Sequence, residues 1–302
     1  MRALLVVGLA LVAAVSASVS IPKSYHDEIG IPEARRIKAL EDKALSDAKA
    51  LSPLQRIVGG AAAPVNAHPY LGGLVISLVN VAGNSVCGSS LVSPNRLVTA
   101  AHCWFDGVRQ AWQFIVVLGS QFLFSGGIRI GTSNVVMHPQ YSPSLLFNDV
   151  AVIYLPSSVS FTNAIQPVSL PSSWELSETF VGDWAVAAGY GRTSDRKYRN
   201  QILPSNPIHH HVSLRIISVA ECQGTFPVNV IASTLCTSGA GGVGVCGGDS
   251  GGPLVVNLWG RIILVGISSF AAQVGGSSAC QRGFPSGFAR VTSFHSFITQ
   301  HL

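Results

Sequence analysis

The hydrophobic pattern of the chain changes twice, near residue 18 and near residue 57. An uninterrupted apolar run, from Ala3 to Ala17, comes first. Residues 18–56 then mix apolar and charged side chains at helical spacing. From Ile57 onward, apolar runs rich in β-forming residues alternate with clusters of Gly, Pro, Asn and Ser. We therefore expect three regions of different structure.

Residues 18–56 predict one short amphipathic helix. Its apolar positions lie three or four residues apart, with charged residues between them. These positions are Ile37, Leu40, Ala44, Ala48 and Leu51. We expect the helix to end at Ser52-Pro53, because a proline disfavours helical geometry in the residue before it.

The region after residue 57 predicts an all-β architecture. The expected strands are Tyr70–Leu78, Ser90–Thr99, Phe114–Leu118, Ile128–Met137, Val150–Leu155 and Ile262–Ser268. Short strands separated by turn residues are typical of a barrel or a sandwich. A helix should close the chain near Thr292–Leu302, with Phe294, Phe297 and Ile298 on its apolar face.

The composition indicates a folded protein that is exported. Of the 302 residues, 48% are hydrophobic and 11% are charged, which excludes a disordered chain. The mean hydropathy is +0.41, but the longest apolar run is shorter than the roughly 20 residues of a membrane-spanning helix. Met1-Arg2, the apolar stretch after it and Val15-Ser16-Ala17 fit the charged, apolar and cleavage parts of a signal peptide, residues 1–17. We expect a secreted, extracellular protein with no membrane partner.

Cysteines and charges narrow the function further. In an exported chain an even number of cysteines favours disulfides over metal ligands, although their spacing alone leaves the pairing open. The six are Cys87, Cys103, Cys222, Cys236, Cys246 and Cys280. We expect no metal site: no CxxC pair occurs, and His209-His210-His211 fits a strand end better than a ligand set, because neighbouring strand residues face opposite sides.

The charge distribution argues against a nucleic-acid partner. Residues 1–56 hold eight of the 19 basic and six of the 14 acidic residues. The 11 basic and eight acidic residues that remain give a net charge of +3, scattered without a basic run.

Three separated motifs carry candidate chemistry. The first places His102 directly before Cys103 at the end of a predicted strand; the second places Asp149 before a buried strand; the third is the run Gly247 to Pro253, which contains Ser250. Each motif alone is more typical of a structural residue or loop than of a catalytic one. Together, in the order His, Asp, Ser, they indicate nucleophilic catalysis by a serine that a histidine activates.

With these motifs, residues 57–302 resemble the chymotrypsin-like serine protease family. The likeness begins at Arg56-Ile57-Val58-Gly59-Gly60 and reaches the terminal helix. It is strongest to the secreted digestive chymotrypsin-like enzymes of insects, partly through the stretch Tyr25 to Glu33. The family implies two six-stranded antiparallel β-barrels, about residues 57–165 and 166–302, followed by a short C-terminal helix.

The resemblance also implies roles for the motif residues. Ser250 would be the nucleophile, His102 the base that takes its proton, and Asp149 the carboxylate that orients His102. The backbone N–H groups of Gly248 and Ser250 would form the oxyanion hole. No cofactor is expected.

The family further implies that the chain is a zymogen with residues 18–56 as its prosegment. Cleavage after Arg56 would free the α-amino group of Ile57, which would pair with Asp249. The implied disulfides are Cys87–Cys103, Cys222–Cys236 and Cys246–Cys280. Because residues 18–56 hold no cysteine, we expect the prosegment to leave once it is cut.

The resemblance places Gly244 at the base of the substrate pocket, beside Val245. Neither carries a charge, so cleavage after Lys or Arg is disfavoured and a trypsin-like protease is expected to activate the protein. The matched pocket walls are Ser269, Phe270, Ala271 and Ser286. Ala271 and Ser286 stand where open pockets of the family have glycine, so the resemblance implies a narrower mouth that favours Leu, Met or smaller groups over Trp. We expect chymotrypsin-like cleavage after large apolar residues, with elastase-like cleavage after small ones as the alternative.

Two alternative hypotheses about function remain. The chain could be a non-catalytic protease homologue that binds partners, or a signalling or immune protease. The preferred reading is a monomeric digestive endopeptidase of the gut lumen, with protein and peptide substrates and protein inhibitors of proteases as its partners.

Overall fold

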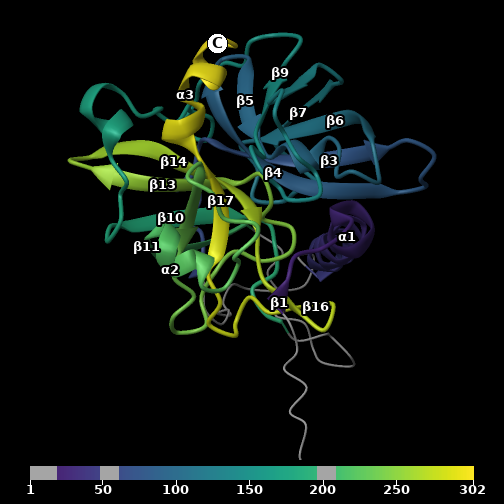
Figure 1. Ribbon diagram of the computed structural model, residues 1–302. Coiled ribbons are helices and arrows are strands. Elements are labelled where there is room, and N and C mark those ends of the chain that lie inside the picture. Colours follow the sequence, from purple (N-terminus) through teal and green to yellow (C-terminus); the bar gives the residue numbers. More distant parts are fainter. Residues whose placement is uncertain (1–18, 48–60, 196–208) are drawn as a thin grey trace, which may run out of the picture.

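The computed structural model describes residues 19–47, 61–195 and 209–302 (Figure 1). The expected signal peptide, the segment with Arg56 and Ile57, and the predicted helix positions Ala48 and Leu51 lie outside the described residues. Two antiparallel sheets dominate the described part. This all-β architecture with a short C-terminal helix confirms the predicted fold class.

The sheet from the second half of the chain closes into a barrel. Its strands are β10 (Trp184–Gly189), β11 (His210–Ile217), β12 (Thr234–Thr237), β13 (Pro253–Leu258), β14 (Arg261–Phe270) and β17 (Ser286–Arg290). They follow the order β10-β13-β14-β17-β12-β11, and β10 also pairs with β11, which closes the ring. Leu214, Leu235 and Phe288 are fully buried inside it.

The sheet from the first half is an open ladder. Its strands are β3 (Leu71–Leu78), β4 (Asn84–Ser93), β5 (Arg96–Thr99), β6 (Ala111–Leu118), β7 (Ile128–Thr132), β8 (Val135–Met137) and β9 (Ala151–Tyr154). The order is β7-β6-β3-β4-β5-β9-β8, and the two edge strands are consecutive in the chain. The predicted second closed barrel is therefore only half formed.

The sequence predicted one strand over Ile128–Met137, but the structure has two, β7 and β8, separated by a bend. The Thr132 hydroxyl donates to the Tyr154 carbonyl oxygen (2.6 Å) and accepts from the Asn134 N–H (3.1 Å), which turns the chain between β7 and β8. The predicted strand Ser90–Thr99 is also divided. Pro94 interrupts it, because proline has no N–H for a sheet ladder, and β4 and β5 pair as a hairpin with Ser93 opposite Arg96.

The two ends of the described region 61–302 each pack against the opposite half of the protein: the first strand joins the second sheet, and the last helix packs against the first sheet. Strand β2 (Ala61–Ala62) pairs with β11 of the second sheet. Helix α3 (Val291–Thr299) buries Phe294, Phe297 and Ile298, as predicted, in a cluster made largely of side chains from the first sheet. The remaining short elements are η2 (Ala101–Cys103), η3 (Ser173–Ser177), α2 (Val219–Gln223), β15 (Gln273–Val274) and β16 (Ser277–Ser278).

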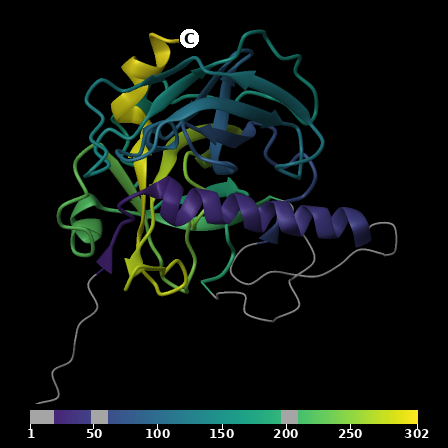
Figure 2. The same cartoon turned by 90° about the vertical axis from the view of Figure 1, so that its right-hand side faces the viewer.

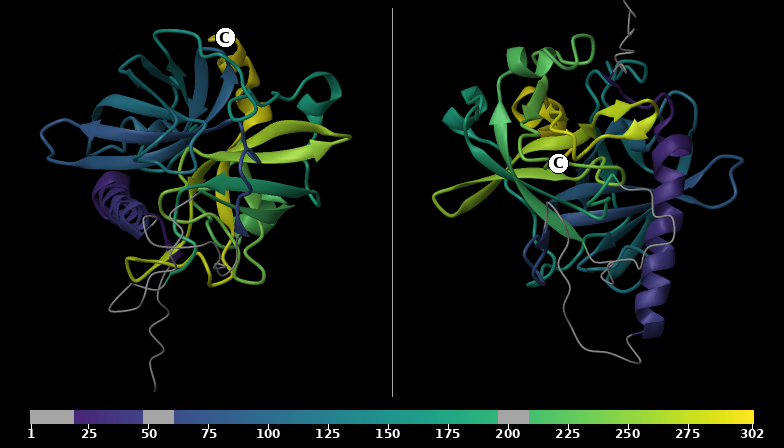
Figure 3. Two further views of the ribbon diagram at one scale, coloured as in Figure 1. Left: turned by 180° about the vertical axis from the view of Figure 1, so that it is seen from behind. Right: turned by 90° about the horizontal axis from the view of Figure 1, so that it is seen from below.

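The described N-terminal segment, residues 19–47, packs against both halves. It contains β1 (Val19–Ser20), η1 (His26–Gly30) and α1 (Ile31–Asp47). Figure 2 shows α1 lying across the molecule below the strands of the first sheet, and Figure 3 shows it from behind and from below.

The buried face of α1 differs from the predicted one. Ile37 is buried as expected, but Leu40 and Ala44 are only half-buried. Two carboxylates, Glu33 and Glu41, lie on the buried face instead, each only 1% exposed. Burial of a charge requires partners. Glu33 pairs with Arg36 of the same helix and with Arg192, and Glu41 binds backbone N–H groups of Leu123 and Phe124. No helix among the described residues is both long and apolar enough to cross a membrane.

Candidate active site

The strand pairing brings two of the three predicted catalytic residues together. His102 lies in η2 just after β5, and Asp149 lies just before β9. Strands β5 and β9 pair antiparallel with Thr99 opposite Ala151, so the end of one strand meets the start of the other. Both side chains are 1% exposed.

The Asp149 carboxylate holds the His102 ring in a fixed orientation. Its Oδ2 lies 2.7 Å from His102 Nδ1, and its Oδ1 accepts the His102 backbone N–H at 2.9 Å. The Ser269 hydroxyl donates to the same Oδ2 at 2.5 Å. With Nδ1 bound to the carboxylate, Nε2 is the ring nitrogen left for proton transfer. Sequence reasoning gave Ser269 only a place in the pocket wall and missed this contact.

The loop that carries Ser250 packs against the first sheet, near the end of β5. The Ser250 carbonyl oxygen accepts the Gly88 N–H at 2.6 Å. The next residue, Gly251, has a φ of +79°, and a Cβ there would lie 2.4 Å from the Gly88 carbonyl oxygen and 2.2 Å from Thr99 Oγ1. Only glycine permits this approach between the two halves.

The proton-transfer contact itself is not made. His102 Nε2 is buried and has no hydrogen-bond partner among the described residues. The ring of Tyr25, from the N-terminal segment, lies against the His102 ring with centroids 4.5 Å apart. The structure thus shows the predicted base oriented but covered.

The loop before Ser250 contains a carboxylate without a cationic partner in the described chain. Asp249 accepts N–H groups from Gly191 (2.8 Å) and Cys246 (3.0 Å). Burial raises the pKa of Asp249 to about 6, although these hydrogen bonds and the charge of Arg36 oppose the rise. Gly248, in the same loop, has a φ of +100°, a conformation that favours glycine.

A cavity of about 50 Å³ adjoins Asp249. Glycines and histidines form part of its wall, among them Gly189, Gly191, His210 and His211. Because the cavity borders a partly buried carboxylate, it could receive a small apolar group that carries a positive charge.

The predicted pocket residues do not all line one cavity. Val245, Ser269, Phe270 and Ala271 line a space of about 20 Å³ beside Ser250. Gly244 lines the cavity at Asp249 instead, where a Cβ on it would lie 2.9 Å from Ser286 Oγ.

The aromatic ring of Phe270 makes this space small and partly apolar. Its ring is 5% exposed and packs edge-on against Phe226, with centroids 5.2 Å apart. A Cβ on Gly287 would lie 2.2 Å from the ring, so the ring occupies the space that this glycine leaves.

Three disulfides brace these loops. They link Cys87 to Cys103, Cys222 to Cys236 and Cys246 to Cys280, the pairs that the resemblance implied. Each of the two groups of potential metal ligands found among the described residues contains two of these bonded cysteines. Such sulfurs are not thiolates, so neither group suits a metal ion.

Known proteins similar to this chain agree on one family. The family description Trypsin matches residues 57–298. Brachyurin of Leptuca pugilator is 35% identical over 245 residues, covering 80% of this chain and 96% of its own length. Collagenase of Hypoderma lineatum is 33% identical over 247 residues, covering 82% and 87%. The solved structure of HL collagenase superposes with a TM-score of 0.70 at 33% identity and covers 81% of this chain and 98% of its own. The chain therefore belongs to the trypsin family of chymotrypsin-like serine proteases and is a serine endopeptidase.

Proposed function

We propose that Ser250, His102 and Asp149 perform the peptide hydrolysis, with Ser250 as nucleophile. The observation that carries this assignment is the 2.7 Å contact between His102 and Asp149 beside the Ser250 loop. His102 takes the Ser250 proton as the hydroxyl attacks the peptide carbonyl, and then gives that proton to the leaving amine. Water hydrolyses the acyl-enzyme by the same steps, and Asp149 stabilises the imidazolium formed each time.

The tetrahedral intermediate needs donors for its oxyanion. The backbone N–H groups of Gly248 and Ser250 donate to no other group in the described chain, so they remain available for it. Losing one such donor costs about 3–4 kcal/mol of transition-state stabilisation in enzymes of this kind.

The zymogen proposal rests on Asp249 and the cavity beside it. Cleavage after Arg56 gives Ile57 a charged α-amino group, which would pair with the Asp249 carboxylate while the Ile57 side chain enters the cavity. Ala61 pairs with His211, which lines that cavity. Ile57 is four residues before Ala61, so a chain of at most about 14 Å links it to the cavity wall.

The pocket favours cleavage after apolar residues. Val245, Phe270 and Ala271 supply no charge to pair with a Lys or Arg side chain. Large apolar residues are the proposed preference and small residues the alternative. A protein of this preference does not cut efficiently after Arg56, so a trypsin-like protease activates it.

The proposed setting is digestion of dietary protein in the gut lumen. An extracellular location fits the family, and protein inhibitors of proteases are the further partners proposed. Because one relative is named collagenase, collagen is a suitable substrate to include in tests.

The test uses protein activated with immobilised trypsin and a library of peptides. Cleavage after Phe, Tyr or Leu is expected, preference for Ala or Val would establish the elastase-like alternative, and cleavage after Lys or Arg would contradict the pocket assignment. Arg56→Gln is the control and should stay inactive. A reagent that labels active-site serines should modify Ser250 in the activated protein; an unlabelled Ser250 would favour the non-catalytic homologue.

A further inference from the structure

We propose that residues 19–47 are an inhibitor of the protein's own active site, and that the surface they cover binds the same segment as a separate peptide. The proposal rests on the proposed function, since the covered surface is taken to be the peptide-cleaving site. It goes beyond activation through Ile57, because the block comes from occupation of the cleft and not from an incomplete oxyanion hole.

Tyr25 occupies the centre of the site. It is 5% exposed, stacks at 4.5 Å against His102 and donates its hydroxyl proton to the Val86 carbonyl oxygen at 2.8 Å. In this position the phenol covers the imidazole that must face Ser250. A substrate acyl group cannot approach Ser250 past it.

The same segment closes the substrate pocket. Pro22, Tyr25 and Ile29 complete the wall of the 20 Å³ space beside Ser250. Just before them, β1 pairs antiparallel with β15, with Ser20 opposite Gln273, which itself lines this space. The segment thus adds a strand at the place where a bound peptide would have to run.

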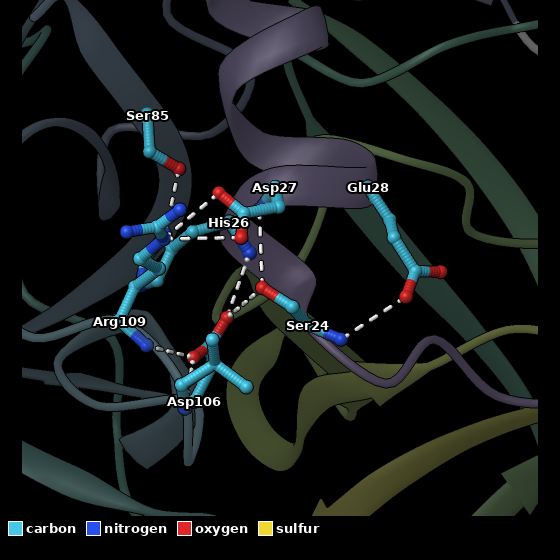
Figure 4. A network of polar contacts seen from close by, with 8 residues as sticks. Ser24, His26, Asp27, Glu28, Ser85, Asp106 and Arg109 are labelled. Carbon is cyan, nitrogen blue, oxygen red and sulfur yellow. Dashed lines mark hydrogen bonds and ion pairs between the residues drawn. The ribbon is translucent and has the colours of Figure 1, made fainter. Parts of the chain in front are cut away.

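A polar network holds η1 to the loop that carries His102 (Figure 4). Asp106 Oδ2 accepts the Ser24 hydroxyl at 3.0 Å and the His26 backbone N–H at 2.9 Å. His26 Nδ1 lies 2.8 Å from the Ser85 hydroxyl. Ser24, His26 and Asp106 are each less than 10% exposed, so these contacts are shielded from water.

The two buried carboxylates of α1 bind partners in the rest of the protein, and Glu33 also binds an arginine of the same helix. Glu33 pairs with Arg192, which follows the second sheet's β10, and with Arg36 at 2.6 Å. Glu41 accepts the N–H groups of Leu123 (2.5 Å) and Phe124 (2.9 Å), which follow β6. One helix therefore bonds to both halves of the protein.

These glutamates also explain why α1 packs in one register only. Glu33, Ile37 and Glu41 are four residues apart and share one face. Ile37 packs in a cluster that includes Leu71, Val86 and Leu123. A shift of one helical turn would place a carboxylate where Ile37 lies, without a donor.

Apart from Arg36, which belongs to the segment itself, these partners lie after the activation bond, so they remain on the enzyme when the segment is cut off. The segment has no cysteine and thus no covalent tie. As a free peptide of this length it loses most of its helix in water, which lowers its affinity without removing its contacts. Cleavage and release are therefore separate steps.

The test is inhibition of the activated protein by a synthetic peptide of residues 19–47. Protein activated with immobilised trypsin and freed of its own segment is assayed with a chromogenic peptide, and binding is measured in parallel by calorimetry. We expect competitive inhibition by the wild-type peptide. Tyr25→Ala should raise the inhibition constant at least about tenfold, whereas Lys38→Gln, on the exposed face of α1, should change it less than about twofold.

The outcomes separate the inhibitor proposal from the proposed function. If the protein hydrolyses substrate and the wild-type peptide neither inhibits nor binds, or if Tyr25→Ala acts like the wild type, the inhibitor proposal is wrong. If the protein hydrolyses nothing but binds the wild-type peptide and not Tyr25→Ala, the proposed function fails and the binding site stands.

Discussion

Single carboxylates in this protein differ sharply in what surrounds them. Asp149 has an imidazole and two further donors, and Glu33 has two guanidinium groups. Within the described residues, Asp249 accepts hydrogen bonds from backbone N–H groups alone, and burial raises its pKa. Because an unpaired buried charge is costly, the carboxylate of Asp249 gains more from a new cation than those of Asp149 and Glu33.

The first prediction concerns the three proposed catalytic residues. Ser250→Ala and His102→Ala should each lower kcat by about a millionfold, and Asp149→Asn by about ten-thousandfold, because the nucleophile and its base act as a unit. Hydrolysis of a peptide substrate, normalised to the concentration of folded, cleaved protein, measures this. A Ser250→Ala protein that retains activity would contradict the assignment.

The second prediction concerns the width of the pocket. The resemblance places Ser286 in the wall of the substrate pocket, and its hydroxyl lies 2.9 Å from the Cβ position of Gly244, which lines the cavity at Asp249. Ser286→Gly removes this hydroxyl. The kcat/KM ratio for Phe over Leu substrates should rise about tenfold, as expected when one or two atoms of pocket wall are removed. Ser157→Gly, in the exposed loop after β9, is the matched control. An unchanged ratio would remove Ser286 from the pocket wall.

At the scale of elements, the sequence predicted strands better than their breaks. Continuous apolar runs marked β3, β6, β9 and β14, because a buried strand needs apolar residues on both faces. The bend at Thr132 could not be foreseen, since it depends on a hydrogen bond to Tyr154, which is distant in sequence. The same reason hid the buried face of α1: the partners of Glu33 and Glu41 come from the loops after β10 and β6.

The candidate site shows the same limit. The order His102, Asp149, Ser250 was readable because the neighbouring residues form local motifs. Tyr25 was noticed only as part of a stretch typical of a family, and nothing local connects it with a histidine 77 positions later. The sequence of α1 did contain a signal. Glu33 and Glu41 lie four residues before and after Ile37 and interrupt the apolar face, and a buried carboxylate requires a partner.

The third prediction is a pH dependence carried by η1. Burial lowers the pKa of His26 to about 4; the charges of Asp106 and Asp27 oppose this, whereas those of His102 and Arg109 add to it. The free peptide takes up a proton at His26 below about pH 6.5, and docking must release it again. The affinity of the peptide should therefore be constant above pH 7 and about tenfold weaker at pH 5.5.

A His26→Gln peptide is the control for that titration. Its affinity is lower at pH 8 because the contact with Ser85 changes, but the difference between pH 8 and pH 5.5 should shrink. Equal pH profiles for the two peptides, measured by calorimetry, would assign the titration to another group.

At the scale of the whole molecule, the N-terminal segment, residues 19–47, contacts both halves of the protein and so adds to the core contacts that hold them together. Its contacts reach Asp106 and the loop after β6 in the first half, and Arg192 and β15 in the second. A ligand that binds only the folded protein raises its free energy of unfolding by RT ln(1 + [L]/Kd), where [L] is the free ligand concentration. The segment should therefore act as a stabiliser of the fold as well as an inhibitor.

The last prediction follows from this linkage. In activated Ser250→Ala protein, which cannot digest itself, the peptide of residues 19–47 at a hundredfold excess over its Kd should add about 2.7 kcal/mol to the free energy of unfolding. The Tm should then rise by roughly 5–10 °C in scanning calorimetry, since about 1 kcal/mol shifts a domain of this size by 2–4 °C. The Tyr25→Ala peptide at the same concentration should give about half that rise, because its larger Kd lowers the ratio of peptide concentration to Kd that sets the stabilisation. A wild-type peptide that inhibits hydrolysis yet leaves the Tm unchanged would mean that it binds the cleft without the contacts of α1 that span the two halves.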